Sequence, residues 1–371
     1  EGFSSYTHSS THPFKIALSV EKDTAAHRTL KTRALYRQFK KNDIPEAYFA
    51  FLRSDSSGLT EYLDRSLFKD QIMNAEHEAQ KLTLGRDNQK IGNLIRERLK
   101  GRNDFVLIGG PPCQAYSLIG RSRMKHVEDF ESDERHILYR HYLNVIAEFK
   151  PAVFVMENVK GLATLSKFDA IRADLIKIGF QFGYSTDLAL FNSKDFGVPQ
   201  ARERMFLVGL LNRKPFYLAD YIKQHQRPEV TTAEAITHLG RQGSELNPKT
   251  CNAEVTTAAN PVMRKSPYAG MLFNGLGRPL NPDKPCATLL ASMGGSNTPI
   301  IDEEQFFGSG KSWVEEYHRE LTLGNPPRDW KSTPNFIRRL TLKEAHILHT
   351  FPENYIFSGP NSSIYTQVFF Y

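Results

Sequence analysis

The chain has 371 residues, of which 40% are hydrophobic and 24% are charged, and its formal net charge is +7. This length accommodates one large domain and a smaller one, and no uninterrupted apolar run approaches the roughly 20 residues of a membrane span, which argues against a membrane protein. Three cysteines in so long a chain exclude a disulfide framework and fit a reducing compartment, and the basic surplus suits a polyanionic partner such as DNA.

The first part of the chain predicts a strand, a helix and then a long polar segment. Residues 15–20 predict a strand that ends near the acidic residues Glu21 and Asp23, and the four-residue spacing of apolar side chains after it predicts a helix. Residues 40–102 are polar and highly charged, which indicates helix in parts and gives little strand signal. The continuous apolar run 105–108 is typical of a central parallel strand.

Residues 109–117, Gly-Gly-Pro-Pro-Cys-Gln-Ala-Tyr-Ser, follow that run directly. Neither proline has a backbone N–H and each fixes its own φ, so the segment cannot continue a sheet or a helix. Cys113 is therefore expected on a rigid loop at the carboxyl edge of a sheet, where open α/β folds place their sites. Considered alone, a cysteine beside a strand is more often a small buried hydrophobe, and both interpretations stay open at this point.

Strands and helices then alternate along the chain. Residues 120–134 predict a mobile polar loop, and a helix over 138–149 follows it. A strand over 153–156, a helix that Gly179 ends and a strand over 205–210 complete the series. This alternation predicts an α/β protein with a mostly parallel, helix-covered sheet.

The pattern changes after residue 210. Residues 211–335 contain short segments broken by Gly, Pro, Asn and Thr, which predicts a second, irregular, β-containing domain. A helix over 340–348 is expected to return the chain to the first domain. The predicted organisation is therefore a first domain over 1–210, a second over 211–335 and a return to the first over 336–371.

Four short motifs occur in order along the chain. They are Pro-Cys-Gln at 112–114, Glu-Asn-Val at 157–159, Gln-Ala-Arg-Glu-Arg at 200–204, and Arg-Arg-Leu-Thr at 338–341 running on to Phe-Pro at 351–352. Each alone is a weak match, but in this order and spacing they resemble the motif set of the DNA (cytosine-5)-methyltransferases. The resemblance covers most of the chain.

This resemblance implies a fold and a reaction. The implied fold is a Rossmann-like, S-adenosylmethionine-dependent methyltransferase sheet with helices on both faces, formed by 1–210 and 336–371. A smaller, irregular, β-containing target recognition domain is implied for 211–335. The implied reaction is methylation of carbon 5 of a flipped-out cytosine in duplex DNA, in a restriction-modification system.

The implied chemistry gives each catalytic candidate a role. Carbon 5 of cytosine is a poor nucleophile, so Cys113 is expected to add to carbon 6 as a thiolate and to raise the electron density at carbon 5. Glu157 is expected to protonate or hydrogen-bond ring nitrogen 3. Arg204 is expected near the target base with Arg202 in support, because alternate residues of an extended segment point the same way. The plain alternatives are a solvated glutamate and a surface pair of arginines.

The resemblance also implies S-adenosylmethionine as the methyl donor. Glu21, after the first strand, resembles the acidic residue that accepts hydrogen bonds from a ribose diol. Asp87 is the candidate for the adenine amine, and Pro111 and Gln114 are expected to border the cofactor.

No metal is expected. His346 and His349 lie three residues apart on a predicted helix, which is a spacing that metals can use. Because no carboxylate or cysteine partner can be assigned to them, they are expected to be packing or surface residues.

A duplex hides its bases, so the target nucleotide must be flipped out before it reacts. The basic loop over 120–134 is expected to close over the flipped DNA, and the second domain is expected to read the sequence. The candidates for DNA contact are Gln200, Arg121, Arg123, Thr288, Leu289, Gly294 and Gly295. The expected partners are double-stranded DNA and a cognate restriction endonuclease acting on the same site, and the protein is expected to be a cytoplasmic, nucleoid-associated monomer.

Two motifs of the family are absent, one from each end of the chain. Family members open with a strand and a Phe-x-Gly-x-Gly turn that cradles the methionine part of the cofactor, and they close with a Gly-Asn pair and a helix. We therefore expect a chain truncated at both ends, with weak or no cofactor binding and poor solubility. A non-catalytic DNA-binding remnant is thus a second hypothesis. A transfer-RNA methyltransferase is a third, which the absence of a Cys-Phe-Thr signature in the second domain disfavours.

Overall fold

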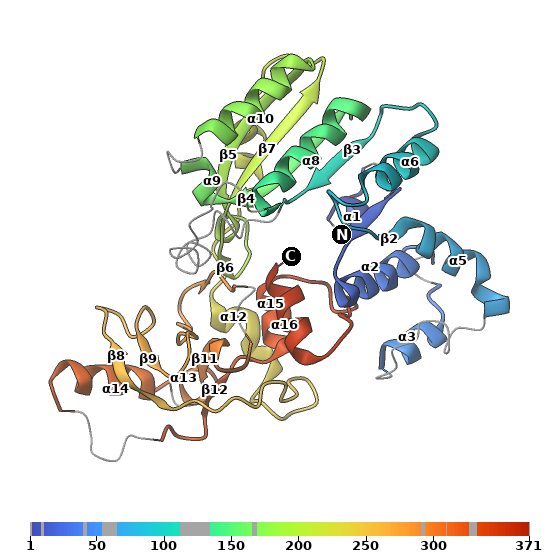
Figure 1. Ribbon diagram of the computed structural model, residues 1–371. Helices are drawn as coiled ribbons and strands as arrows, with labels where there is room; N and C mark the ends of the chain where they lie inside the picture. The colour runs from blue at the N-terminus through green and yellow to red at the C-terminus, as the bar shows by residue number, and fades with distance from the viewer. Residues whose placement is uncertain are drawn as a thin grey trace. The chain divides into compact units, whose positions relative to one another are not determined.

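The structure, a computed structural model, describes residues 2–8, 11–39, 43–53, 65–111, 134–164, 169–290, 294–308, 310–325 and 332–370. Its chain divides into two units (Figure 1). Unit 1 comprises Glu1–Leu190 and Met205–Ala219, and unit 2 comprises Phe191–Arg204 and Asp220–Tyr371. Each unit has hydrophobic cores of its own.

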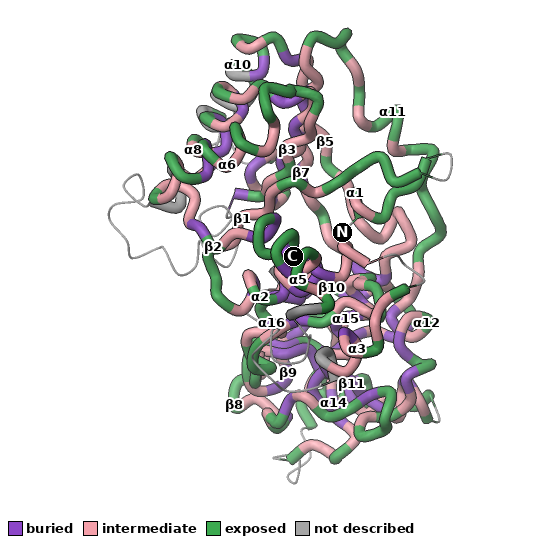
Figure 2. The backbone as a smooth tube through the Cα atoms, turned by 90° about the vertical axis from the view of Figure 1, so that its right-hand side faces the viewer, coloured by how far each residue is buried: buried purple, intermediate pink, exposed green. Residues whose placement is uncertain are grey.

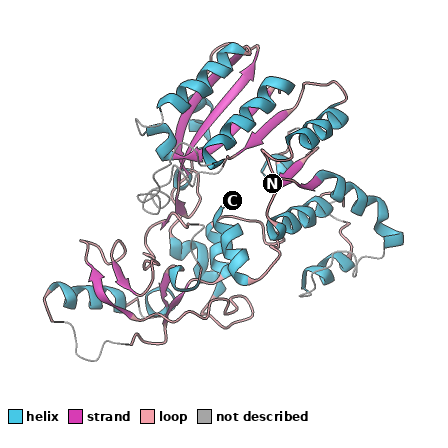
Figure 3. Ribbon diagram, in the orientation of Figure 1, coloured by secondary structure: helices cyan, strands magenta, loops and turns pink. Residues whose placement is uncertain are grey.

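The larger sheet of unit 1 has the strand order β3-β4-β7-β5 (Figure 3). Its strands are β3 (Val106–Gly109), β4 (Val153–Val159), β5 (Tyr184–Asn192) and β7 (Glu203–Leu211). β3 and β4 are parallel. β7 is antiparallel to β4, because Leu211 at its end bonds Ala152 just before β4 (N···O 3.0 Å). It is also antiparallel to β5, because the Asn212 N–H bonds Gly183 O at 3.0 Å.

Helix α8 (Glu134–Phe149) packs against this sheet. Its buried residues Leu143 and Ile146 share a core with Phe154 and Met156 of β4. Every second side chain of β4 is buried, and these side chains pack against the buried face of α8. Helices α6 (Asn88–Leu99) and α10 (Asp169–Gln181) lie beside α8. This arrangement confirms the predicted α/β class.

A second parallel pair, β1 (Ser19–Glu21) with β2 (Ala79–Lys81), belongs to the same unit. Helix α2 (Thr24–Tyr36) begins where the Asp23 carboxylate accepts the N–H groups of Ala25 and Ala26, both at 2.9 Å. α2 packs on helix α5 (Arg65–Glu78), and the two share a small core. β1 and the helix after it were predicted from the sequence. β2 was missed, because three residues reading Ala-Gln-Lys give no alternating apolar pattern.

The predicted end of helix α10 is wrong. Gly179 was expected to terminate it, but the helix runs through this residue to Gln181. A Cβ on Gly179 would lie 2.4 Å from Cγ2 of Thr186, so the glycine lets the helix pack closely on β5. The positive φ typical of a residue that follows a helix occurs instead at Gly183, at +83°.

Unit 2 is built from short strand pairs and helices. Its strands are β6 (Gln200–Ala201), β8 (Thr257–Val262), β9 (Met271–Phe273), β10 (Cys286–Ala287), β11 (Ile300–Asp302) and β12 (Ile337–Arg339). β6 and β10 are parallel, whereas β8 with β9 and β11 with β12 are antiparallel. These short, interrupted strands agree with the irregular β-containing region predicted after residue 210.

Helices complete unit 2. They are α12 (Thr232–Ile236), α13 (Glu303–Phe307), α14 (Trp313–Thr322), α15 (Leu342–Leu348) and α16 (Asn361–Phe370). The predicted helix over 340–348 is confirmed as α15, which begins at a capping box formed by Thr341 and Glu344. Buried residues, purple in Figure 2, gather about α15, α16 and β11. The assignment of 336–371 to the catalytic domain stays a prediction.

The other helices in the described residues are α1 (Gly2–Ser5), α3 (Glu46–Arg53), α9 (Lys160–Thr164) and α11 (Leu218–Ile222). In the part of the chain that the structure describes, no helix combines the length and the apolar character that a bilayer crossing requires.

Gly209→Ala is expected to destabilise unit 1. A Cβ on Gly209 of β7 would lie 2.0 Å from Cε1 of Phe154, a buried ring of the core. Overpacking of this kind typically costs about 1–3 kcal/mol of unfolding free energy. Urea unfolding measures the change, with Gly2→Ala as the control, because a Cβ on Gly2 meets nothing within 4 Å. An unchanged midpoint for Gly209→Ala would contradict the expectation.

Candidate active site

The ends of β3 and β4 bring the Glu-Asn-Val motif beside Gly110 and Pro111, the residues that precede the Pro-Cys-Gln motif. Gly109 is the last residue of β3 and pairs with Met156 of β4. The side-chain amide of buried Asn158 donates to the Pro111 carbonyl oxygen at 3.0 Å. The segment that leads towards Cys113 is therefore tied to the Glu-Asn-Val segment.

Glu157 lies beside the same segment. It is half-buried and lies inside β4, which runs on to Val159, so the predicted strand end at Met156 is wrong. A Cβ placed on Gly110 would lie 3.2 Å from Glu157 Oε2, so the carboxylate packs against the backbone of this glycine. A carboxylic acid in this position can exchange a proton with a group brought to the edge of the sheet.

Four predicted site residues lie outside the described residues. They are Cys113, Gln114, Arg121 and Arg123. Their roles stay predictions, as does the loop predicted over 120–134. Pro111, which is described, is buried.

Tyr142 of α8 reinforces the junction of β3 and β4. Its hydroxyl oxygen lies 2.9 Å from Val155 O and 3.3 Å from Leu107 O. Its ring packs against Gly109, where an added Cβ would lie 2.6 Å from Cε2. Burial raises the pKa of Tyr142, so the hydroxyl stays a protonated donor. Sequence analysis missed this role, because Tyr142 falls on the apolar face of a predicted helix and only its polar atom distinguishes it.

The two acidic candidates for cofactor binding follow adjacent parallel strands. Glu21 is the last residue of β1, and its Oε1 accepts the Asp23 N–H at 2.7 Å. Asp87 follows β2 and accepts the Thr83 N–H at 2.7 Å. The hydrogen bond from Arg86, followed by that from Thr83, lowers the pKa of Asp87. Glu21 therefore lies at the carboxyl end of β1, whereas Asp87 lies beyond the adjacent strand β2, at the start of helix α6.

Gln200 lies at the centre of a network in unit 2. It is only 1% exposed, its Nε2 donates to Leu348 O at 3.3 Å, and its Oε1 accepts the Leu289 N–H at 3.2 Å. Thr288 Oγ1 donates to Ala201 O at 2.7 Å. The structure thus brings Gln200, Thr288 and Leu289 together, with Gln200 and Leu289 buried. A contact of these side chains with DNA stays a prediction.

Arg202 and Arg204 share a neighbour. Arg202 Nη1 donates to Leu289 O at 3.5 Å, and Arg204 Nη1 donates to Glu203 O at 2.9 Å. Burial, together with the positive charges of Arg202 and Arg204, lowers the pKa of His349 to about 3. The common direction of the two arginine side chains stays a prediction.

His346 and His349 both pack on the ring of Phe351. The His346 Nε2 bonds Tyr355 O at 3.0 Å, and its ring stacks on Phe351 with a centroid separation of 5.5 Å. Burial lowers the pKa of His346 to about 4. His349 stacks on the same ring at 6.2 Å. Within the described ranges, no group of three or more His, Cys, Asp or Glu residues could hold a metal.

The predicted glycine pair precedes a short turn. Gly295 begins the 3-10 turn η5 (Gly295–Asn297), is exposed and has a φ of +55°. A Cβ on Gly294 or Gly295 meets nothing within 4 Å. Both residues therefore belong to an open surface turn of unit 2.

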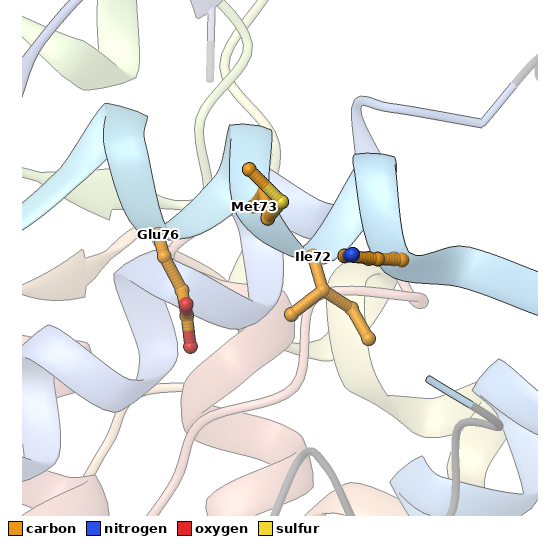
Figure 4. A pocket seen from close by; sticks show the side chains of 4 residues that line it. Ile72, Met73 and Glu76 are labelled. Carbon is orange, nitrogen blue, oxygen red and sulfur yellow. The ribbon is translucent and has the colours of Figure 1, made fainter. Parts of the chain in front are cut away.

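The structure also contains a surface hollow in unit 1. It measures about 220 Å³ and is lined by Lys69, Ile72, Met73 and Glu76. Figure 4 shows that its lining comes from a single helix, α5. None of the predicted site residues lines it.

Known proteins similar to this chain include several methyltransferases. The family model described as C-5 cytosine-specific DNA methylase matches residues 77–368. The Type II methyltransferase M.Bpa9945I of Bacillus paralicheniformis is 28% identical over 411 residues, covering 96% of this chain and 90% of that protein. The Type II methyltransferase M.AquIA of Picosynechococcus is 35% identical over 160 residues, covering 41% of this chain and 59% of that protein.

A solved structure has the same fold. The chain superposes on the S. pombe Dnmt2 methyltransferase with a TM-score of 0.51 at 14% sequence identity, covering 96% of this chain and 86% of that one. At this level of identity the similarity concerns the α/β fold alone.

Proposed function

The chain belongs to the C-5 cytosine-specific DNA methylase family, and on that premise we propose that it transfers a methyl group from S-adenosylmethionine to carbon 5 of cytosine in duplex DNA. The observation that carries the proposal is the contact of the Glu-Asn-Val motif with the segment that leads to Cys113. Asn158 binds Pro111 O at 3.0 Å, and Glu157 packs against Gly110. A reaction that needs a nucleophile and an acid at one base requires two such segments side by side.

Cys113 supplies the nucleophile in this proposal. Its thiolate adds to carbon 6, a carbon–sulfur bond forms, and the electron pair of the 5,6 double bond moves to carbon 5. Glu157 protonates or hydrogen-bonds nitrogen 3 and so neutralises the charge that addition places on the ring. Once carbon 5 carries the methyl group, its proton passes to a base or to water, the double bond re-forms and the thiolate leaves.

The arginines of the Gln-Ala-Arg-Glu-Arg motif bind the base and its flanking phosphate. A guanidinium offers planar, paired donors to the carbonyl oxygen at position 2 or to a phosphate. Arg204 binds the target cytosine, and Arg202 has a supporting role beside Arg204. Their shared electrostatic effect on His349 supports this pairing of roles.

Glu21 and Asp87 hold the cofactor, with Pro111 and Gln114 at its border. A carboxylate at the end of β1 and a second one in the segment that follows the adjacent parallel strand β2 fit the hydroxyl and amine donors of an adenosine. When bound, S-adenosylmethionine supplies the electrophilic methyl group.

The DNA duplex is bound by both parts of the chain. Arg121 and Arg123 close over the flipped nucleotide, residues 211–335 read the target sequence, and residues 1–210 with 336–371 perform the chemistry. A role in restriction-modification, with a cognate endonuclease for the same site, is supported by the relatives named type II methyltransferases. A monomer located at the nucleoid completes the proposal.

The test is transfer of a labelled methyl group from S-adenosylmethionine. The protein is incubated with duplex DNA or, as the alternative substrate, with transfer RNA, and the labelled nucleoside is identified after hydrolysis. Label in 5-methylcytosine from DNA is the expected result. Label in RNA alone, or at another position of the base, contradicts the proposal, and DNA binding without transfer favours the non-catalytic remnant.

A further inference from the structure

Residues 83–87, between β2 and α6, form a closed turn that we call the Asp87 turn. The Asp87 N–H bonds Thr83 O at 2.8 Å, and the Thr83 N–H bonds Asp87 Oδ2 at 2.7 Å. Gly85, in the middle, has a φ of +102°, which glycine adopts without strain. The position of the Asp87 carboxylate is therefore set by the backbone of this turn.

Asn88 and His141 support the turn from outside. Oδ1 of Asn88 accepts the Gly85 N–H at 2.8 Å, and Nδ2 of the same amide lies 3.0 Å from Nδ1 of His141. Because a backbone N–H can only donate, Oδ1 must face Gly85, so Nδ2 donates and His141 Nδ1 accepts. The imidazole also packs on Gly85, where an added Cβ would lie 3.2 Å from Nε2. One amide thus joins the Asp87 turn to helix α8.

The next residue of α8 contacts the junction of β3 and β4. The Tyr142 hydroxyl donates to Val155 O at 2.9 Å, and its ring packs against Gly109. Helix α8 is therefore held by Tyr142 on the segment that leads to Cys113, and by His141 on the Asp87 turn. Neighbouring side chains of one helix thus fix the turn relative to that segment.

The Asp87 carboxylate can accept a further donor. Within the described residues it accepts the Thr83 N–H, and it accepts Arg86 Nε at 3.3 Å and Arg86 Nη2 at 3.0 Å. A carboxylate has about four acceptor positions, so one remains. The Arg86 side chain is 74% exposed, and so exposed an ion pair contributes little to orienting its partner. The orientation of the carboxylate therefore depends on the turn and on the two residues that support it.

We propose that Asn88 and His141 are positioning residues that hold Asp87 towards the adenine amine of S-adenosylmethionine, and that they make the site selective for adenosine over inosine. The inference deepens the proposed function and rests on it, because it concerns the cofactor role of Asp87. The base of inosine carries an oxygen where adenine carries the amine. It therefore offers the carboxylate an acceptor in place of a donor, and only a well-oriented carboxylate distinguishes the two.

The test compares the Kd of S-adenosylhomocysteine, the demethylated cofactor, with that of S-inosylhomocysteine. The unchanged protein is expected to bind the adenosine ligand about tenfold or more tightly, the usual effect of a hydrogen bond to a charged group. Asn88→Ala and His141→Phe are each expected to weaken this ligand about tenfold and to leave the inosine ligand nearly unchanged. Phenylalanine keeps a ring against Gly85 but accepts no hydrogen bond. The double variant is expected to lose no more than either single one, because both changes break the same connection.

The matched control is Asn93→Ala, which removes an exposed asparagine from the same helix, α6, and is expected to keep the selectivity. Equal weakening of both ligands by Asn88→Ala and His141→Phe, or no weakening, overturns the inference and limits the pair to a structural role. An unchanged protein that binds the two ligands equally, or binds neither, overturns it as well. Labelled methyl transfer by the unchanged protein, measured in parallel, shows separately whether the proposed function stands.

Discussion

Replacing Cys113 with serine is expected to abolish methyl transfer to cytosine. A serine hydroxyl stays protonated at neutral pH, whereas a thiol yields a reactive fraction of thiolate, so serine does not add efficiently to carbon 6. The expected loss in kcat is about 1,000-fold or more, because the covalent route is removed altogether. Labelled methyl transfer at saturating DNA measures the loss, and a separate binding assay shows that the DNA site is intact.

A trapping experiment distinguishes loss of the nucleophile from loss of the folded structure. When the target is 5-fluorocytosine and the methyl donor is present, the methylated carbon 5 carries fluorine in place of a proton, so elimination cannot release the thiolate and the protein stays attached to DNA in detergent. The attached species is expected with the unchanged protein and with Cys286→Ala, but not with Cys113→Ser. Cys286 suits the control because it is buried, and burial raises the pKa of its thiol. An attached species with Cys113→Ser would contradict the assignment.

Glu157→Gln is expected to slow methyl transfer by about 100- to 10,000-fold, the usual contribution of a general acid. Glutamine keeps the size of the side chain beside Gly110, but its amide has no acidic proton to give to nitrogen 3. DNA affinity is expected to change little, because the acid acts on the ring during addition. The measurements are kcat for methyl transfer, the Kd for DNA and the melting temperature.

The control for this substitution is Glu245→Gln, which changes an exposed glutamate of unit 2. It is expected to leave kcat as it is. Normal turnover by Glu157→Gln would show that Glu157 is not the general acid. A loss of activity matched by a lower melting temperature would limit its role to supporting β4.

The regular elements of unit 1 were predictable because their patterns are local. The apolar run at 105–108 became β3, although at the edge of the four-stranded sheet and not at its centre as predicted, and the helical spacing over 138–149 became α8. β2 depends on its neighbour β1 for its hydrogen bonds, so its own sequence carries little signal. Gly179 shows the same limit. This glycine lies within the helix and allows it to pack closely on Thr186 of the next strand, a contact that the local sequence does not reveal.

The candidate site was predictable in part for a similar reason. Strand ends brought Pro111 and Glu157 to one edge of the sheet, as parallel strands require. A motif indicates that a residue is important, but not whether the residue binds a ligand or stabilises the fold. Gln200 illustrates this, since its amide joins two backbone segments and is buried. The hydroxyl of Tyr142 could not be foreseen either, because its partners are main-chain oxygens of distant strands.

Arg339 holds two loops of unit 2, residues 274–278 and 294–298 (the loop pair), through the main-chain oxygens of Thr298 and Asn274 and through the side-chain oxygen of Asn274. A peptide carbonyl is the same in every residue, so this anchor is indifferent to the side chains displayed at the tip. The residues that support the loop pair are therefore distinct from those exposed at its tip. A library that varies Leu276 while keeping Asn274, Arg339, Gly275 and Gly277 is expected to yield folded proteins with altered DNA preferences. The exposed tip of the loop pair can therefore be redesigned without changing the residues that anchor it.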